Sequence, residues 1–209
     1  MQPASASRTA IWGASNLSLG DDIGGTASAP PVFSVVGKSD SGKTGVVERL
    51  VRELTGRGYK IATVKHHKHA VDIDVPGKDS WRHARAGSHV TMISSPTQFA
   101  VIRRVERERT LAEIAEAAGE VDLVLTEGFM RSGPTRIEVS RRERSSEGIV
   151  PAEERFALVT DNPELADAGR PRFGLDDIVG LADLVEAELR ARQGRQGRRP
   201  AAEEAADGD

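Results

Sequence analysis

The chain has 209 residues, with 29 Lys and Arg against 32 Asp and Glu, and it contains no cysteine. Because neither sign of charge dominates, non-specific binding to nucleic acid or to an anionic membrane surface is not expected to be its task. The lack of cysteine excludes a disulfide scaffold, a thiolate nucleophile and a cysteine-ligated zinc or iron–sulfur site. No apolar run approaches the roughly 20 residues that span a bilayer. We therefore expect a cytoplasmic protein that has neither nucleic acid nor membrane as a partner.

Composition divides the chain into three parts. Residues 1–31 are rich in Ala, Ser, Gly and Pro, and we expect a mobile N-terminal arm. Residues 191–209 form a basic patch followed by an acidic end, which predicts a disordered charged tail. Residues 32–190 remain as one folded domain.

Within that domain, short apolar runs alternate with segments of helical spacing. Strands are predicted at Val32–Val36, Tyr59–Val64, His89–Ile93, Gln98–Ile102, Val121–Thr126, Arg136–Ser140 and Phe156–Thr160. Helices are predicted at Val46–Leu54, from a cap at Asp79 or Ser80 to about Gly87, at Leu111–Ala118 and at Leu175–Arg190. This alternation is typical of an α/β fold with a largely parallel sheet flanked by helices.

A phosphate-binding loop follows the first predicted strand. Residues 37–44 read GKSDSGKT and match the pattern G-x-x-x-x-G-K-[ST] in full. The glycines let backbone N–H groups turn toward phosphate oxygens, Lys43 can reach the β- and γ-phosphates, and the Thr44 hydroxyl can bind Mg²⁺. The loop leads from a strand into a helix, so we predict a P-loop NTPase-type fold. Its nucleotide site comprises Gly37, Lys38, Ser39, Asp40, Ser41, Gly42, Lys43 and Thr44.

Two P-loop positions carry charges that need an explanation. Asp40 stands where glycine would be more comfortable, although aspartate tolerates left-handed backbone better than most residues. Lys38 matches the place where some dimeric P-loop ATPases have a lysine that reaches the partner's nucleotide. The alternative for Lys38 is a solvated lysine near phosphate.

A second ligand for the metal is expected from the end of a neighbouring strand. Asp122 begins the apolar run VDLVLT and would lie at its amino end, away from the P-loop. Glu127 follows the same run directly and would lie at the carboxyl edge, where open α/β sheets bind ligands. We therefore predict that Glu127 holds the metal or its water, and serves as the catalytic position.

All five histidines lie between His66 and His89. Imidazole and carboxylate groups bind transition metals, and the segment offers both in His66, His67, His69, Asp72 and Asp74. Its cations suit an anionic ligand equally well; they include Lys65, Lys68, Lys78 and Arg82. A solvated polar loop is the third interpretation. The segment follows the second predicted strand, which places its start at the same sheet edge as the P-loop.

Five segments in this order resemble the MobB family of molybdopterin guanine dinucleotide biosynthesis. They are GKSDSGKT, TVKHHKHAVDIDVPGKDSWRHARAG, DLVLTEGF, RIEVSR and ALVTD. The resemblance covers about residues 32–189, and PGKDSWRH is its specific element. It implies a P-loop protein, usually dimeric, that binds GTP with Mg²⁺ and hydrolyses GTP weakly. It also implies association with MobA, the guanylyltransferase that joins GMP to molybdopterin, to which such a protein would supply GTP or the pterin.

The resemblance also assigns roles to residues of this chain. Gly42, Lys43 and Thr44 would hold phosphate and Mg²⁺, with Glu127 at the end of the Walker B strand. The signature loop contributes candidate ligand contacts at His66, Asp74, Lys78, Asp79 and Ser80. Asp161 would accept hydrogen bonds from guanine N1 and N2; as an alternative it is a turn or cap aspartate before Asn162-Pro163. Gly45 departs from the threonine common in the family.

Two other functions fit the same P-loop. A small-molecule kinase would need a cationic lid over the migrating phosphate, for which the chain offers Arg103, Arg104, Arg107, Arg109 and the 141–144 cluster. Glu106 and Glu143 lie among these arginines, which favours a self-paired surface instead. A metallochaperone would use the histidine segment.

Overall fold

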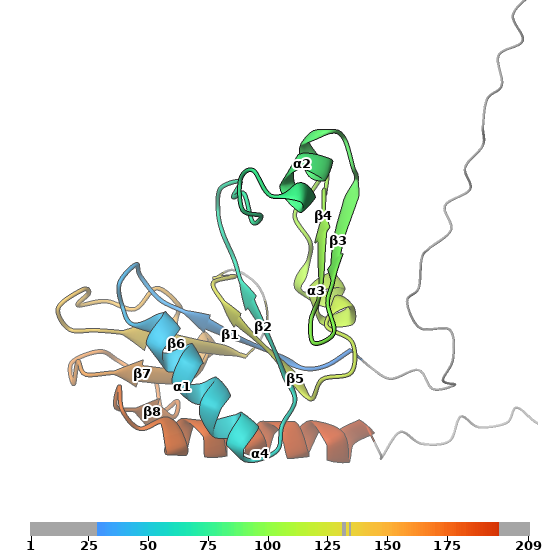
Figure 1. Cartoon of the computed structure of the whole chain (residues 1–209). Coiled ribbons are helices and arrows are strands. Elements are labelled where there is room, and N and C mark those ends of the chain that lie inside the picture. The colour runs from blue at the N-terminus through green and yellow to red at the C-terminus, as the bar shows by residue number, and fades with distance from the viewer. Residues whose placement is uncertain (1–28, 131–132, 134, 197–209) are drawn as a thin grey trace, which may run out of the picture.

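Six parallel strands run through the centre of the molecule in the order β2-β5-β1-β6-β7-β8. The computed structural model (Figure 1) describes residues 29–130, 133 and 135–196. The strands are β1 (Val32–Val36), β2 (Ile61–Lys65), β5 (Leu123–Glu127), β6 (Arg136–Ser140), β7 (Arg155–Thr160) and β8 (Arg172–Phe173). The parallel sheet and its flanking helices confirm the predicted fold class.

Two helices cover one face of this sheet. Residues of a strand point alternately to its two faces, and Phe33 and Val35 of β1 point to the face beneath α1 (Lys43–Gly56) and α4 (Ile178–Gln196). There they join Leu50 of α1 with Leu181 and Val185 of α4, all fully buried. Figure 1 shows α1 crossing the sheet with α4 running beside it. Burial of each such side chain contributes about 1.5–3 kcal/mol, so this layer anchors the helix that follows the P-loop.

The other face of the sheet is buried but more polar. Ser34, Thr126 and Glu138 point to it and are almost inaccessible to solvent. The Thr126 hydroxyl donates to Ser34 Oγ at 3.0 Å, so these two polar groups satisfy each other.

The short helix α3 (Leu111–Ala117) begins with a capping box, in which the Thr110 side chain accepts the backbone N–H of Glu113.

A separate unit stands away from the parallel sheet (Figure 1). Residues 66–110, here called the 66–110 segment, connect β2 to α3 and contain α2 (Asp79–Arg85), β3 (Val90–Ser94) and β4 (Phe99–Arg103). Strands β3 and β4, both predicted from the sequence, form an antiparallel pair in a two-stranded sheet of their own. The segment exposes a set of large apolar side chains: Val71, Ile73, Val75, Met92, Ile93, Phe99, Val101 and Val105.

The starts of α1 and α2 differ from the prediction. Helix α1 begins at Lys43, three residues before Val46, because the P-loop backbone passes directly into the helix and the Val46 N–H donates to the Gly42 carbonyl at 3.1 Å. Neither Asp79 nor Ser80 caps α2, so that prediction was wrong. Lys78 has the extended backbone of a cap, and its carbonyl accepts the N–H of Arg82 at 2.9 Å. Asp79 is instead the first helical residue.

The last helix is also shifted. It begins at Ile178 because Asp177 caps it, its carboxylate accepting the Gly180 N–H at 3.1 Å. It is described as far as Gln196, and Glu188 pairs with Arg192 and Arg195 of its following turns. The expected disordered tail was therefore wrong for residues 191–196; residues 197–209 and most of the predicted arm lie outside the described residues. Among the helices that are described, none has the length and apolarity to cross a membrane.

Candidate nucleotide-binding site

The P-loop (residues 37–44) lies at the carboxyl edge of the sheet, between β1 and α1. A Cβ at Gly37 would lie 2.3 Å from the Val139 carbonyl oxygen, so only glycine fits beside β6. Asp40 adopts the left-handed backbone expected for it, with φ of 60°. Gly42, at φ of 92°, is the residue from which α1 starts. The loop therefore has the curled backbone and the helix start that a phosphate site requires.

Lys43 lies folded back on this loop. Its Nζ donates to the Lys38 carbonyl oxygen at 2.6 Å. Burial lowers the pKa of the Lys43 ammonium, Glu127 opposes that shift, and the neighbouring Lys65 ammonium adds to it. A phosphate oxygen would offer the Lys43 ammonium a charged acceptor in place of a carbonyl, so Lys43 is suited to bind phosphate.

Thr44 and Glu127 meet although 83 residues separate them in the chain. The Thr44 hydroxyl lies 3.0 and 3.1 Å from the two carboxylate oxygens of Glu127. Glu127 ends β5 next to β1, and only 10% of its side chain is exposed. A hydroxyl and a carboxylate are the hard oxygen ligands that Mg²⁺ prefers, so the two residues predicted to hold the metal fit it.

A pocket of about 820 Å³ opens over the P-loop. Five cationic side chains line it, against two carboxylates, Asp40 and Glu127. The cations are Lys38, Lys43, Lys65, Lys68 and Arg141. This balance favours a polyanionic ligand.

His66 marks the boundary between this pocket and a neighbouring one of about 700 Å³. Its backbone N–H donates to the Glu127 carbonyl at 3.0 Å, and its ring lies against Phe129 with 4.4 Å between ring centroids. Its Nε2 pairs with Glu108. Gly128 makes this arrangement possible, because a Cβ there would lie 2.8 Å from His66 Cβ. The structure thus brings His66 to the P-loop pocket.

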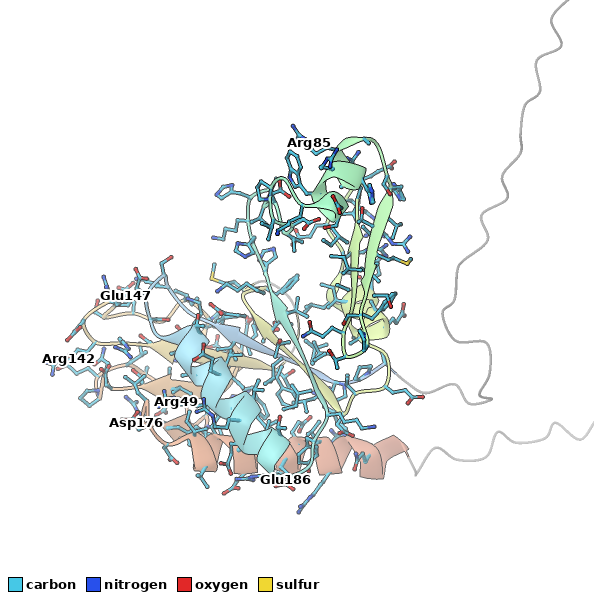
Figure 2. All side chains as sticks on the ribbon, in the orientation of Figure 1. Arg49, Arg85, Arg142, Glu147, Asp176 and Glu186 are labelled. Carbon is cyan, nitrogen blue, oxygen red and sulfur yellow. The ribbon has the colours of Figure 1, made fainter. Side chains whose placement is uncertain are left out.

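The other signature-loop residues stay on the 66–110 segment. Asp74 accepts the N–H of Val75 at 2.8 Å, and Asp79 lies 3.7 Å from Arg82. Neither they nor Lys78 and Ser80 line the pocket over the P-loop. Trp81 of PGKDSWRH contacts other parts of the 66–110 segment: its Nε1 donates to Asp72 at 3.0 Å, and Arg85, labelled in Figure 2, lies 5.3 Å over its ring. A ligand role for Asp74, Lys78, Asp79 and Ser80 stays a prediction.

The histidine segment shows no converged metal site. In the part of the chain that the structure describes, no group of three or more histidines and carboxylates lies close enough to hold a metal ion. His66 is engaged by Glu108 and Phe129.

Asp161 lies at the end of β7, and its carboxylate accepts the backbone N–H of Arg142 at 2.7 Å. Arg142 follows β6 and is labelled in Figure 2. This contact joins two loops at the carboxyl edge of the sheet. Asp161 does not line the P-loop pocket, so its role toward guanine stays a prediction beside the turn role that the contact displays.

The arginines weighed as a kinase lid divide into two groups. Arg107 pairs with Glu113 through two hydrogen bonds of 2.7 and 2.9 Å, so it is self-paired as the sequence favoured, although its partner lies in α3 and is not Glu106. Arg141 behaves differently: it lines the pocket, and a Cβ at Gly42 would lie 3.1 Å from its Nε. The acidic neighbours of Arg141 in the sequence hide this role, and its place directly after β6 is the signal that indicates it.

Comparison with known proteins identifies the family. The family model described as molybdopterin guanine dinucleotide synthesis protein B, MobB, matches residues 32–161. The molybdopterin-guanine dinucleotide biosynthesis adapter protein of Haemophilus influenzae is 28% identical over 158 residues, 75% of this chain and 88% of that protein. The protein of the same name from Escherichia coli is 29% identical over 170 residues, 78% of this chain and 96% of that protein.

Solved structures agree with this result. A crystal structure of molybdopterin-guanine biosynthesis protein B superposes with a TM-score of 0.58 at 32% identity, covering 76% of this chain and 99% of that one. The crystal structure of Bacillus subtilis MobB gives a TM-score of 0.60 at 28% identity, covering 76% and 98% of the two chains. With the P-loop, the Thr44–Glu127 contact and the parallel sheet in place, the chain belongs to the MobB family.

Proposed function

We propose that this protein is a GTP-binding adapter in the synthesis of molybdopterin guanine dinucleotide, where it assists a MobA-type guanylyltransferase. The observation that carries the proposal is the P-loop under a cationic pocket, with Thr44 held against Glu127, in a chain of the MobB family. The names of its relatives, which describe adapters of this biosynthesis, support the pathway.

Mg²⁺ accompanies the nucleotide in this proposal, held by the Thr44 hydroxyl and by Glu127 directly or through a water. When bound, the ion would neutralise phosphate charge. Lys43 and the P-loop backbone bind the phosphates, and Lys38 and Arg141 add positive charge to the lining of the pocket. Of the two carboxylates at the pocket, Glu127 is engaged by Thr44 and Lys65, so we expect slow hydrolysis at most.

The neighbouring pocket of about 700 Å³ is where we place molybdopterin. It adjoins the nucleotide pocket through His66 and Lys68, which line both. Phe129 offers an aromatic wall, and Arg109 offers a cation for the phosphate of the pterin. Two small molecules would then lie side by side for transfer to the partner enzyme.

The protein acts as a homodimer in this proposal. The exposed apolar side chains of the 66–110 segment, among them Met92 and Phe99 with 52% and 60% exposure, form the kind of surface that marks protein interfaces. Sedimentation or light scattering of the full chain, compared with a Phe99→Asp variant, tests this part.

Titration calorimetry with GTP and with ATP, each with Mg²⁺, tests the central claim. We expect a clear preference for GTP and loss of binding in Lys43→Ala with an unchanged melting temperature. The control Lys60→Ala, at the exposed residue directly before β2, should bind normally. Preference for ATP would overturn guanine recognition and favour the alternative function, a small-molecule kinase. Failure to co-purify with the guanylyltransferase would overturn the adapter role.

A further inference from the structure

The last residue of β2 adds a second lysine at the centre of the site. Lys65 and Glu127 are register partners on the neighbouring parallel strands β2 and β5, and the Lys65 ammonium pairs with Glu127 Oε1. Thr44 approaches the same carboxylate from α1. The buried carboxylate of Glu127 therefore contacts both Thr44, the other predicted metal ligand, and Lys65, a lysine that the P-loop motif does not include.

We propose that Lys65 is a γ-phosphate sensor: it pairs with Glu127 in the nucleotide-free protein and binds the γ-phosphate when a nucleoside triphosphate is present. The inference rests on the proposed function for the presence of a nucleotide and its Mg²⁺. It adds that Lys65 makes the protein distinguish a triphosphate from a diphosphate.

The two partners differ in their freedom to move. Half of the Lys65 side chain is exposed, against 10% of the Glu127 side chain. A lysine carries its charge on a four-carbon stem that can swing into solvent or toward a ligand. Glu127 stays fixed between Thr44 and the end of the sheet, so Lys65 is the partner that leaves.

Electrostatic repulsion would move Lys65 away from Glu127 when a metal ion is bound. Among the residues that the structure describes, Lys65 forms its ion pair with Glu127. A divalent cation at Thr44 and Glu127 would repel the Lys65 ammonium, because like charges in a partly buried site interact strongly. Lys65 lines the pocket over the P-loop together with Lys43, so a phosphate in that pocket is the nearest new anion for it.

Lys65 also lies where the bound phosphate could affect the 66–110 segment, because that segment begins at the next residue. The next residue, His66, donates its backbone N–H to the Glu127 carbonyl and begins the 66–110 segment. Lys65 is thus the last side chain of β2 before the chain leaves the sheet.

A double-mutant cycle in the nucleotide-free protein tests the ion pair. We expect Lys65→Met to lower the melting temperature by about 2–4 °C, and to have little effect in the background of Glu127→Gln. Lys60→Met, at the exposed residue directly before β2, is the matched control. An equal effect of Lys65→Met in both backgrounds would show that the pair does not form, which would overturn the proposal.

Calorimetric titration with GTP and GDP, both with Mg²⁺, tests the sensing step. Loss of one charged hydrogen bond corresponds to about a tenfold or larger change in affinity. We expect Lys65→Met to weaken the affinity for GTP by that factor while the affinity for GDP stays unchanged. Lys65→Arg should keep most of the preference for GTP over GDP. Equal weakening of both nucleotides, or of neither, would overturn the proposal.

The two proposals fail in different ways. If the wild-type protein binds neither GTP nor GDP, the proposed function falls, and the same comparison with ATP and ADP then decides the role of Lys65, which depends on the phosphate and not on the base. If no triphosphate binds, both proposals fall. If GTP binds and Lys65→Met leaves its preference over GDP intact, only the sensor falls.

Discussion

The guanidinium of Arg155 and the carboxylate of Glu138 form a buried ion pair across strands β6 and β7, with 2.6 Å between Nε and Oε2 and side-chain exposures of 4% and 1%. The same carboxylate accepts the backbone N–H groups of Ile149 and Val150. Ile149 lines the pocket over the P-loop. The pair therefore holds in place the loop that forms one wall of the nucleotide site.

Replacing Arg155 by methionine should destabilise the protein strongly. Removal of one partner leaves the other charge buried without compensation, which costs about 3–5 kcal/mol. Urea unfolding measures the loss. Arg52→Met, an exposed position of α1, is the control and should have little effect. Adding Glu138→Gln to Arg155→Met should recover part of the stability; if it does not, the cost comes from packing of the Arg155 side chain and not from an orphaned charge.

Gly128 is the second position where the site depends on a close approach. Its φ is 110°, and a Cβ would lie 2.8 Å from His66 Cβ. Gly128→Ala should therefore destabilise the protein by about 1–3 kcal/mol through backbone strain, and should weaken nucleotide binding because His66 and the end of β5 would have to separate.

Gly45 provides the matched control for that substitution. It lies in α1, and a Cβ there meets no atom within 4 Å. Gly45→Ala should stabilise the protein by about 0.5–1 kcal/mol. Thermal melting of both variants measures the contrast, and an equal response of the two positions would contradict the role of Gly128.

Much of this architecture could be predicted from the sequence because local patterns determine it. Runs such as Val32–Val36 and the P-loop motif report a buried strand and the turn that follows, and Glu127 follows from its place at the end of an apolar run. The α2 cap was missed because Lys78, a residue without capping chemistry, holds the extended backbone there, and the capping preference of aspartate is only a tendency.

Long-range relationships in the site could not be predicted in the same way. Whether β3 and β4 join the main sheet depends on strand pairing, which five-residue strands do not encode locally. The partnership of Lys65 with Glu127 needs the parallel register of β2 and β5, in which a shift by one residue would turn the side chain to the other face. Arg141 likewise becomes a pocket residue only when β6 lies beside β1.

The hydroxyl of Thr44 should make nucleotide binding sensitive to Mg²⁺. The measured quantity is the ratio of nucleotide affinity in Mg²⁺ to nucleotide affinity in EDTA. We expect Thr44→Ala to lower this ratio by at least about tenfold, because the variant lacks one contact to the metal. Thr44→Ser should retain it. Thr55→Ala, at the exposed far end of α1, is the control. Calorimetric titrations in the two buffers give the ratio, and an unchanged ratio in Thr44→Ala would place the metal elsewhere.

Acid should weaken the contact between α4 and the residues that follow α1, through Glu186, which is labelled in Figure 2. The Tyr59 hydroxyl donates to this carboxylate at 2.9 Å and Arg57 at 3.0 Å, and these contacts, led by the Tyr59 hydrogen bond, hold the pKa of Glu186 below its ordinary value of 4.5. Because the pKa is lower in the folded state, the contribution to stability is complete above pH 4.5 and is lost as the pH falls below it. Urea midpoints measured from pH 7 to pH 3 should fall less steeply in Glu186→Gln than in the wild type, whereas Glu116→Gln, an exposed position on α3, should follow the wild type. Identical acid profiles for Glu186→Gln and the wild type would show that protonation of this carboxylate does not couple to folding.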